Sequence, residues 1–268
     1  LADEVPLASD LNDWKLKLTE SEKSLIGNIL KSFAQTEVHV NDYWSTKVSV
    51  WFPKPEIQAM ARVFADFESI HAEAYARLNE ELGLDDFKAF LEDEVSKAKI
   101  ERLIETPGET IEDRAISLAI FSAFTEGVNL FSSFAVLLSF KLRNLLKGVG
   151  QIVEWSIRDE SLHSKAGCWL FRTLIQENPE LNTPELKAAI TEAALLSLQL
   201  ELDFKQRIDL TINNTIMIIG EIKNIFFPEG CMQEDGFLDI EKAGTITCSG
   251  LDSYHLSKSL ARLPYAKV

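Results

Sequence analysis

Apolar residues recur at spacings of three and four over roughly the first 210 positions, a pattern typical of amphipathic helices. Thr19 and Glu22 form a capping-box pair, which indicates that a helix begins there. Sequence signals for strands are sparse in the same region. We therefore expect an all-α fold, with helices at about 19–46, 56–81, 85–104, 110–146, from after 150 to 176, and 183–210.

Glycines mark several of the expected helix ends. Gly83 follows the second predicted helix and is a natural helix stop. Gly148 and Gly150 are predicted to form the turn after the long apolar helix. The helical periodicity is lost in residues 211–268. We expect this segment to be a C-terminal extension of a single domain that spans 1–268.

The most informative motif is Glu-x-x-His, which occurs as Glu68/His71 and again as Glu160/His163. Each residue of an α-helix turns the chain by about 100°, so positions i and i+3 share a face. A carboxylate and an imidazole on one face can bind the same metal ion. Each copy of the motif is therefore a candidate half of a metal site.

Two further glutamates make the pattern more specific. Glu37 lies 31 positions before the first motif, and Glu126 lies 34 positions before the second. Two single glutamates and two Glu-x-x-His motifs, one on each of four helices, are the ligand set of ferritin-like di-iron and di-manganese proteins. The sequence therefore predicts a four-helix core that carries a dinuclear metal site.

Counting alone supports this prediction weakly, because Asp252 and His255 have the same spacing in this acidic chain. The surroundings of Glu126 are stronger support. It is the single ionisable residue between Ala115 and Phe140. A lone carboxylate in a buried helix costs several kcal/mol unless it is paired or bound to a metal.

Charge and cysteine content bear on partners and compartment. The net charge of −15 and the pI of about 4.8 argue against nucleic acid or an anionic membrane as a partner. The apolar stretch 115–140 is long enough to span a bilayer, but Glu126 and Asn129 at its centre favour a buried bundle helix. No signal peptide is recognised. The chain has three cysteines, Cys168, Cys231 and Cys248. Their spacing suggests neither a disulfide framework nor a zinc site, which fits a cytoplasmic protein.

The segments Asp66–Tyr75 and Arg158–His163 resemble the two signature segments of the small, radical-generating subunit of class I ribonucleotide reductase. The resemblance covers roughly Ala2 to Asp209 and includes the spacing of all six candidate ligands. It implies a ferritin-like homodimer that activates O₂ and passes a radical to a large catalytic subunit. That subunit would reduce ribonucleotides, which agrees with the lack of a nucleotide-binding loop motif in this sequence.

The resemblance also implies a role for each motif residue. Tyr75 matches the tyrosine that family members oxidise to a stable radical. Asp159 matches the aspartate that is hydrogen-bonded to a histidine ligand and relays the radical outward, and Phe134 matches a residue of the apolar radical pocket. The implied ligands of one metal ion are Glu37, Glu68 and His71, and those of the other are Glu126, Glu160 and His163.

Two positions point to different metals. Glu37 stands where many members have aspartate and resembles the manganese–iron members, yet those usually lack the tyrosine that Tyr75 supplies. Two iron ions, a manganese–iron pair and two manganese ions therefore stay open. The family's pathway tryptophan would align just before Leu1, and the stretch after about Gly220 does not resemble the family's last helices.

Two other functions share the predicted fold. One is an O₂-activating oxidase or oxygenase for a small hydrophobic substrate, which would need a substrate channel. The other is a ferritin-like iron-binding protein, whose chains are usually shorter. Neither has a use for a tyrosine in register with Glu68 and His71, so Tyr75 favours the radical-generating subunit.

Overall fold

The computed structural model describes residues 4–104, 109–206, 211–212, 215–216, 246–249 and 253–256. The chain divides into two compact units, Leu1–Ile219 and Gly220–Val268. The first unit contains the helices and the second contains one hairpin. Each unit is described by itself below.

The helical unit follows the predicted order of elements. Its helices are α1 (Ala8–Leu16), α2 (Glu20–Asp42), α3 (Ser49–Trp51), α4 (Pro55–Glu81), α5 (Phe87–Glu92), α6 (Glu94–Ile104), α7 (Ile111–Ile120), α8 (Leu130–Leu142), α9 (Lys147–Glu177) and α10 (Pro184–Gln206). Two π-helical segments, η2 (Tyr43–Val48) and η3 (Phe121–Asn129), join α2 to α3 and α7 to α8, and a short 3₁₀ turn, η4 (Pro179–Leu181), precedes α10.

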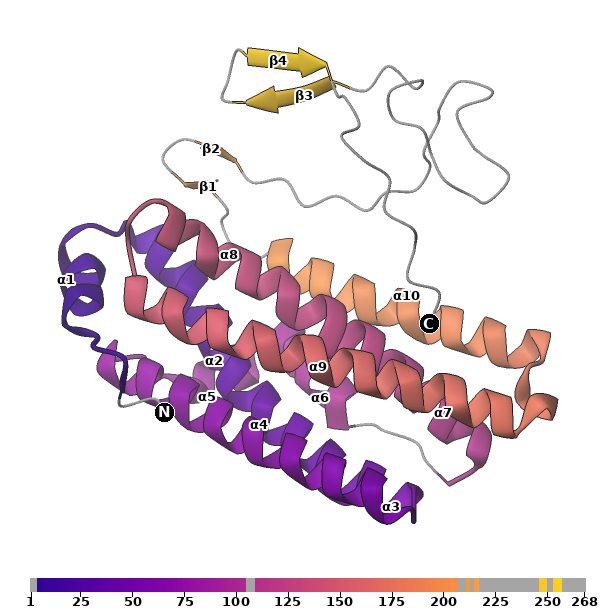
Figure 1. Ribbon diagram of the computed structural model, residues 1–268. Helices are drawn as coiled ribbons and strands as arrows, with labels where there is room; N and C mark the ends of the chain where they lie inside the picture. Colours follow the sequence, from indigo (N-terminus) through magenta and orange to yellow (C-terminus); the bar gives the residue numbers. More distant parts are fainter. Residues whose placement is uncertain are drawn as a thin grey trace. The chain divides into compact units, whose positions relative to one another are not determined.

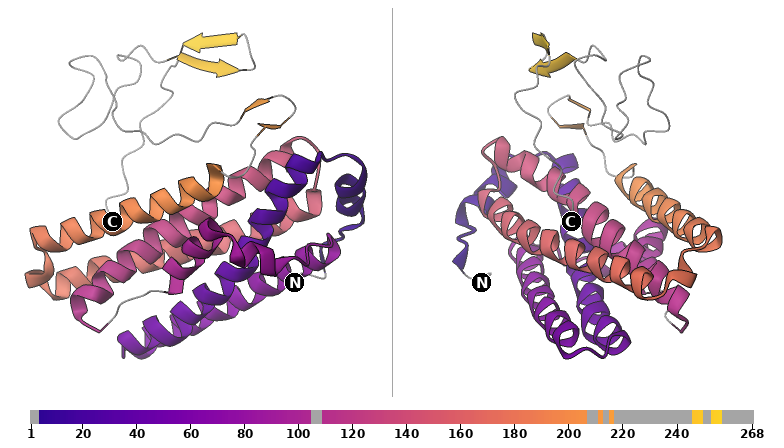
Figure 2. Two further views of the ribbon diagram at one scale, coloured as in Figure 1. Left: turned by 180° about the vertical axis from the view of Figure 1, so that it is seen from behind. Right: turned by 45° about the vertical axis from the view of Figure 1, so that its right-hand side comes forward.

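Four long helical stretches form the core of this unit (Figures 1 and 2). Helix α2 packs along α4, and α9 packs along α7, η3 and α8. Contacts between α4 and α9 and between α2 and α8 join the two pairs. Helix α10 covers α6, α7 and η3 from outside. The all-α prediction with a four-helix core is confirmed.

The interior of the bundle falls into two apolar clusters. One surrounds Phe33, Tyr75 and Phe134, and the other surrounds Trp44 and Phe64. All five rings are at most 4% exposed. Burial of such large side chains contributes about 1.5–3 kcal/mol each, so these clusters hold the helices in fixed positions.

The helix starts that depend on local signals agree with the prediction. Thr19 accepts a hydrogen bond from the backbone N–H of Glu22, whose carboxylate accepts one from the backbone N–H of Thr19. Pro55 occupies the first turn of α4, where its missing N–H leaves no hydrogen bond unmade. Gly83 adopts a φ of 69° just after α4, a conformation that glycine adopts without strain.

The predicted turn at Gly148 and Gly150 is wrong. Both glycines lie inside the first turn of α9, and the turn itself is made by Asn144 and Leu146 with φ values of 65° and 49°. Instead, the glycines leave room for side chains of neighbouring elements. A Cβ on Gly148 would lie 2.8 Å from a methyl carbon of Leu7, so only glycine lets α1 approach α9 this closely.

Three predicted helices differ in detail. The segment 85–104 forms two helices, because Asp93 is extended and its carboxylate accepts a hydrogen bond from the backbone N–H of Ser96. In the segment predicted as one helix over 110–146, the last helical residue is Leu142 and the middle part is the π-helical segment η3. The helix predicted to begin at 19 becomes π-helical after Asp42. The predicted end of the last helix at about Leu210 lies outside the described residues.

Short strands occur after the helices. Strand β1 (Thr211–Ile212) pairs antiparallel with β2 (Thr215–Ile216). In the second unit β3 (Ile246–Ser249) pairs antiparallel with β4 (Ser253–Leu256), with Thr247 opposite His255. The rest of 211–268 lies outside the described residues, so the prediction of a single domain over the whole chain stays a prediction.

The apolar segment Ile111–Leu142 is long and apolar enough, by length and composition, to cross a membrane. Its most apolar window is 56% buried inside the bundle. A core helix of a water-soluble bundle passes the same test, so this segment is weak support for a membrane span.

Candidate metal centre

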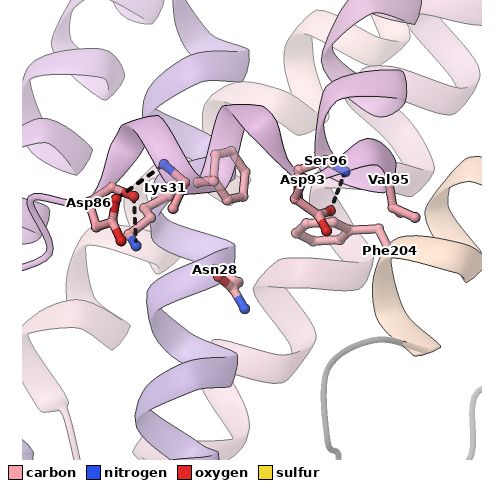
Figure 3. A pocket seen from close by; sticks show the side chains of 9 residues that line it. Asn28, Lys31, Asp86, Asp93, Val95, Ser96 and Phe204 are labelled. Atoms are coloured by element: carbon pink, nitrogen blue, oxygen red, sulfur yellow. Dashed lines mark hydrogen bonds between the residues drawn. The ribbon is translucent and has the colours of Figure 1, made fainter.

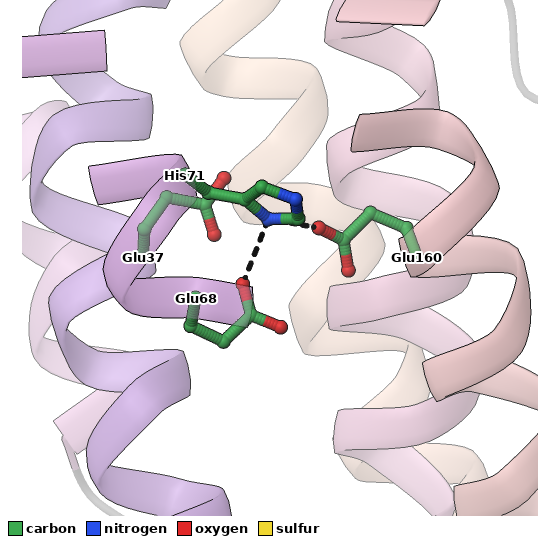
Figure 4. Close-up of side chains that lie close together, drawn as sticks. All are labelled: Glu37, Glu68, His71 and Glu160. Atoms are coloured by element: carbon green, nitrogen blue, oxygen red, sulfur yellow. Dashed lines mark hydrogen bonds and ion pairs between the residues drawn. The ribbon is translucent and has the colours of Figure 1, made fainter. Parts of the chain in front are cut away.

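The structure brings all six predicted ligands together in the middle of the bundle. They come from four elements: α2, α4, η3 and α9. Their potential ligand atoms form two overlapping groups in which all atoms lie within 4.8 Å of one another. The first group is Glu37, Glu68, His71 and Glu160 (Figure 4), and the second is Glu68, Glu126, Glu160 and His163.

Glu68 and Glu160 belong to both groups, and each reaches both imidazoles. The Nδ1 atom of His71 lies 3.1 Å from Glu68 Oε2 and 3.0 Å from Glu160 Oε1. The Nδ1 atom of His163 lies 2.6 Å from Glu68 Oε1 and 3.3 Å from Glu160 Oε2. Each carboxylate thus directs one oxygen to each histidine, the arrangement that two bridging carboxylates need.

The two single glutamates are the carboxylates of the cluster whose pKa burial raises most clearly. Burial, and then the carboxylates of Glu68 and Glu160, raises the pKa of Glu37 well above its usual range. Burial and Glu160 raise the pKa of Glu126 to about 8. Both oxygens of Glu37 and one of Glu126 are buried without a hydrogen-bond partner. These carboxylates therefore favour a proton or another cation beside them.

Both histidines and Glu160 are instead stabilised in their charged forms. Burial opposes a charge on His163, but hydrogen bonds with Glu126, Glu160 and Glu68 raise its pKa to about 12. The pKa of His71 is raised well above its usual range in the same way, by hydrogen bonds with Asp159, Glu160 and Glu68. Burial also opposes ionisation of Glu160, yet its hydrogen bonds hold its pKa below the usual value. The cluster therefore attracts positive charge strongly.

The donor set fits hard divalent metal ions. The two overlapping groups consist of four carboxylates and two imidazoles, all from residues that are at most 5% exposed. Oxygen and imidazole donors without thiolate suit iron or manganese. Metal ions would also satisfy the two orphaned oxygens of Glu37, whose burial without partners is otherwise costly. These six residues could hold two metal ions.

Asp159 lies between this cluster and the surface. Its Oδ2 atom is 3.1 Å from Nε2 of His71, and its side chain is 37% exposed. A histidine that binds a metal commonly donates its other N–H to a carboxylate, which fixes the tautomer. Asp159 occupies that position for His71.

Tyr75 lies one helical turn beyond His71 on α4 and is fully buried. Its hydroxyl donates a 2.9 Å hydrogen bond to Ser156 Oγ. Burial and the Glu37 carboxylate raise the pKa of the phenol, so Tyr75 is neutral in the folded protein. The ring packs against Phe33 with 4.8 Å between centroids, and Phe33 packs on Phe134 at 5.1 Å.

Sequence reasoning missed two residues that contact this site. Trp44 donates a 2.9 Å hydrogen bond from Nε1 to Glu126 Oε1, and Ser156 accepts the Tyr75 hydroxyl. Both contacts join residues more than 80 positions apart, and neither residue belongs to a motif. The other histidine of the helical unit, His39, is half-buried on α2 and lies outside both ligand groups.

A separate cavity of about 360 Å³ lies between α2, α5, α6 and α10 (Figure 3). Lys31, Asp86 and Phe204 are among its lining residues. The ammonium of Lys31 donates a hydrogen bond to the backbone carbonyl of Asp86. None of the six candidate ligands lines this cavity, so it is not an entrance to the metal centre.

Comparison with known proteins places the chain in a family. The sequence model described as "Ribonucleotide reductase, small chain" matches residues 1–222, which is most of the chain. This chain belongs to that family. The probable ribonucleoside-diphosphate reductase small subunit of Invertebrate iridescent virus 6 is 38% identical over 208 residues, which are 72% of this chain and 58% of the relative. The resemblance that the signature segments suggested is thereby confirmed.

More distant small chains agree. The subunit beta of ribonucleoside-diphosphate reductase from Chlamydia pneumoniae is 26% identical over 220 residues, 76% of this chain and 64% of the relative. The chain thus spans about three fifths of the length of these ribonucleotide reductase small chains.

Solved structures establish the fold of this small chain. The dimanganese(II) NrdF of Streptococcus sanguinis superposes with a TM-score of 0.69 at 24% identity, covering 80% of this chain and 76% of that one. The R2-like ligand-binding oxidase of Sulfolobus acidocaldarius gives a TM-score of 0.54 at 21% identity, covering 77% and 88%. The predicted ferritin-like fold is confirmed.

Proposed function

We propose that this chain is the radical-generating small subunit of a ribonucleotide reductase. The observation that carries the proposal is the position of Tyr75, a buried neutral phenol one helical turn beyond His71 and surrounded by apolar rings. In this proposal Glu37, Glu68 and His71 bind one metal ion. The other metal ion is bound by Glu126, Glu160 and His163.

The metal ions would supply O₂ activation and a one-electron oxidant. The protein's own contribution is to place Tyr75 where it can lose an electron and to keep its radical from being quenched. The Ser156 hydroxyl accepts a 2.9 Å hydrogen bond from the phenol and fixes the direction of its O–H. Phe33 and Phe134 exclude water, and phenylalanine rings are poor electron donors.

Asp159 is the proposed exit for the radical. It connects His71 to the protein surface, because one end is hydrogen-bonded to the imidazole and the side chain is 37% exposed. A large catalytic subunit docked near Asp159 would receive the radical and reduce the ribonucleotide. We further expect a homodimer in the cytoplasm, as the family membership suggests.

The metal pair is left open between iron, manganese and a mixture. Relatives of this fold include the dimanganese(II) protein of Streptococcus sanguinis and oxidases reconstituted with Fe/Fe or Mn/Fe. Iron and manganese accept the same oxygen and imidazole donors, and geometry and availability decide between them.

The test is loading of the metal-free protein without O₂, using Fe(II), Mn(II) or both, followed by admission of O₂. We expect two metal equivalents and, in electron paramagnetic resonance spectra, a tyrosyl doublet that disappears in Tyr75→Phe. If no loading yields a tyrosyl or oxidised-metal signal, the proposal fails. A substrate-oxidising enzyme or an iron store of the same fold would bind metal equally well in Tyr75→Phe and form no tyrosyl signal in the wild type.

A further inference from the structure

A row of oxidisable aromatic residues extends away from the metal centre at Trp44. This fully buried indole donates its N–H to Glu126 Oε1 at 2.9 Å. Its ring lies 6.0 Å from the His163 ring and 6.1 Å from that of Tyr43. Trp44 therefore contacts one proposed ligand directly and a second through its ring.

The row continues outward through Tyr43 and Trp51. Tyr43 is 4% exposed, and its centroid lies 5.7 Å from that of Trp51 in an edge-to-face pair. Trp51 is half-buried at the end of α3 and so reaches solvent. The Tyr43 hydroxyl shares a 2.9 Å hydrogen bond with Ser117, in which either oxygen can be the donor.

This side of the centre differs from the side that holds Tyr75. The rings next to Tyr75 belong to phenylalanines, which do not exchange electrons readily, so a radical there is stored. The rings in line from Glu126 are tryptophan, tyrosine and tryptophan, the aromatic side chains that are easiest to oxidise. Such a row passes an electron from ring to ring, and no radical accumulates on it.

We propose that Trp44, Tyr43 and Trp51 form a one-electron route between the metal centre and the surface. The inference rests on the proposed metal-binding function of the cluster. The oxidised centre would take an electron from Trp44, Tyr43 and then Trp51 would refill the vacancy in turn, and an external one-electron reductant would restore Trp51. The donor loses the electron that the metal gains. A proton that leaves the Tyr43 phenol on oxidation returns when the ring is reduced, so no net proton is transferred.

Such a route answers a simple electron count. Reduction of O₂ to two water molecules takes four electrons. Two metal ions that each lose one electron, together with Tyr75, supply three. An electron from an external donor would complete the count, and this row leads from the surface to a ligand of the centre.

The experiment measures electron entry and does not use reductase activity. Protein loaded with Fe(II) without O₂ is mixed rapidly with O₂ and ascorbate, a one-electron donor, so that electron entry is measured while the centre is being oxidised. The loss of ascorbate absorbance and the decay of the optical band of the oxidised centre are both followed. We expect Trp44→Phe, Tyr43→Phe and Trp51→Phe to slow both signals several-fold. Trp155→Phe, which changes an exposed tryptophan of α9, serves as the matched control and should react like the wild type.

Tyr43→Phe and Trp51→Phe separate the route from effects on the ligands. Neither residue is hydrogen-bonded to a ligand, so both variants should keep two iron equivalents while electron entry slows. Equal rates in these variants and the wild type overturn the route. A wild type that binds two iron ions but forms no Tyr75 signal overturns radical generation alone, because the reduction rates still test the route. A wild type that binds no iron overturns both proposals.

Discussion

The Asp159 carboxylate lies 3.1 Å from Nε2 of His71, while Nδ1 of the same imidazole faces Glu68 and Glu160. The Nδ1 atom of His71 is therefore the nitrogen that faces the ligand cluster. It also makes the two roles proposed for Asp159 separable, because orienting His71 would affect metal binding and passing a radical would not.

The orienting role predicts weaker metal binding in Asp159→Ala. Loss of a carboxylate that orients a metal-bound histidine typically lowers metal affinity about 10–100-fold. We expect a loss of that size for one of the two metal ions in Mn(II) titrations of the metal-free protein. Asp159→Asn keeps an acceptor oxygen and should restore part of the affinity. Arg158→Ala, an exposed neighbour, should titrate like the wild type. Unchanged affinity in Asp159→Ala would show that His71 is held by other contacts.

Glu126→Ala should remove one metal equivalent. Glu126 is the single ligand that η3 contributes, and it occurs in one of the two ligand groups. The other group keeps all four of its members in the variant. Metal content after anaerobic loading and desalting measures the effect. Glu73→Ala, an exposed glutamate on α4, is the control. Two retained equivalents would contradict the ligand assignment.

The pKa of Glu126 predicts how the stability of the metal-free protein depends on pH. Its pKa is about 8 in the folded chain, against 4.5 as the ordinary value. The folded state thus binds this proton more tightly than the unfolded state. The stabilisation is complete below about pH 4.5 and is lost as the pH rises through about 8.

Urea unfolding of the metal-free wild type and Glu126→Gln at pH 5 and pH 8 checks this sign. The amide has no proton to lose, so the variant should gain stability relative to the wild type between the two pH values. A constant difference between the two proteins would mean that Glu126 stays protonated, or stays ionised, over the whole range.

The start of α9 depends on two aspartates of α1. Asp10 Oδ1 accepts the backbone N–H of Val149 at 2.8 Å, and Asp13 Oδ2 accepts that of Leu146 at 3.0 Å. Asp10 is 1% exposed, so Asp10→Ala leaves a buried donor without a partner and should cost about 1–3 kcal/mol of unfolding free energy. Chemical denaturation measures the loss. Glu112→Ala, an exposed acid in the first turn of α7, should change stability far less.

Gly167 is needed where α9 passes η3. A Cβ at this position would meet the Ser122 hydroxyl and lie 2.7 Å from Ser122 Cβ. Gly167→Ala should therefore destabilise the fold by about 1–3 kcal/mol, the usual cost of overpacking. Ser122→Gly in the same chain should recover most of the loss, because it removes the side chain that the new methyl group meets. A melting temperature equal to that of the wild type in Gly167→Ala would show that the helices separate at no cost.

Local signals in the sequence account for most of the helix positions and all six candidate ligands. Helical spacing placed Glu68 beside His71 and Glu160 beside His163, and the apolar surroundings of Glu126 singled it out. The contacts that sequence reasoning missed join distant segments. Trp44 reaches Glu126 across 82 positions, and no local pattern encodes that pairing.

The misplaced turn has a related cause. Gly148 and Gly150 are common turn residues, yet here they provide space for side chains of α1 and α8. Asn144 and Leu146 form the turn instead. A leucine in the left-handed region is rare because its Cβ clashes with the backbone there. The contacts of Leu146, which is buried and capped by Asp13, hold it in that conformation.

The two π-helical segments limit how this chain can change in length. Trp44 and Glu126 lie one in each segment and are hydrogen-bonded to each other. A π-helical turn holds more residues than an α-helical turn, so deletion of one residue would allow either segment to return to α-helical form. The residues after the segment would keep their directions, but the residues inside it would turn relative to the bundle by up to about 100°. These helices can accept many substitutions on their outer faces, but an insertion or deletion of one residue would carry Glu126 or Trp44 away from its partner.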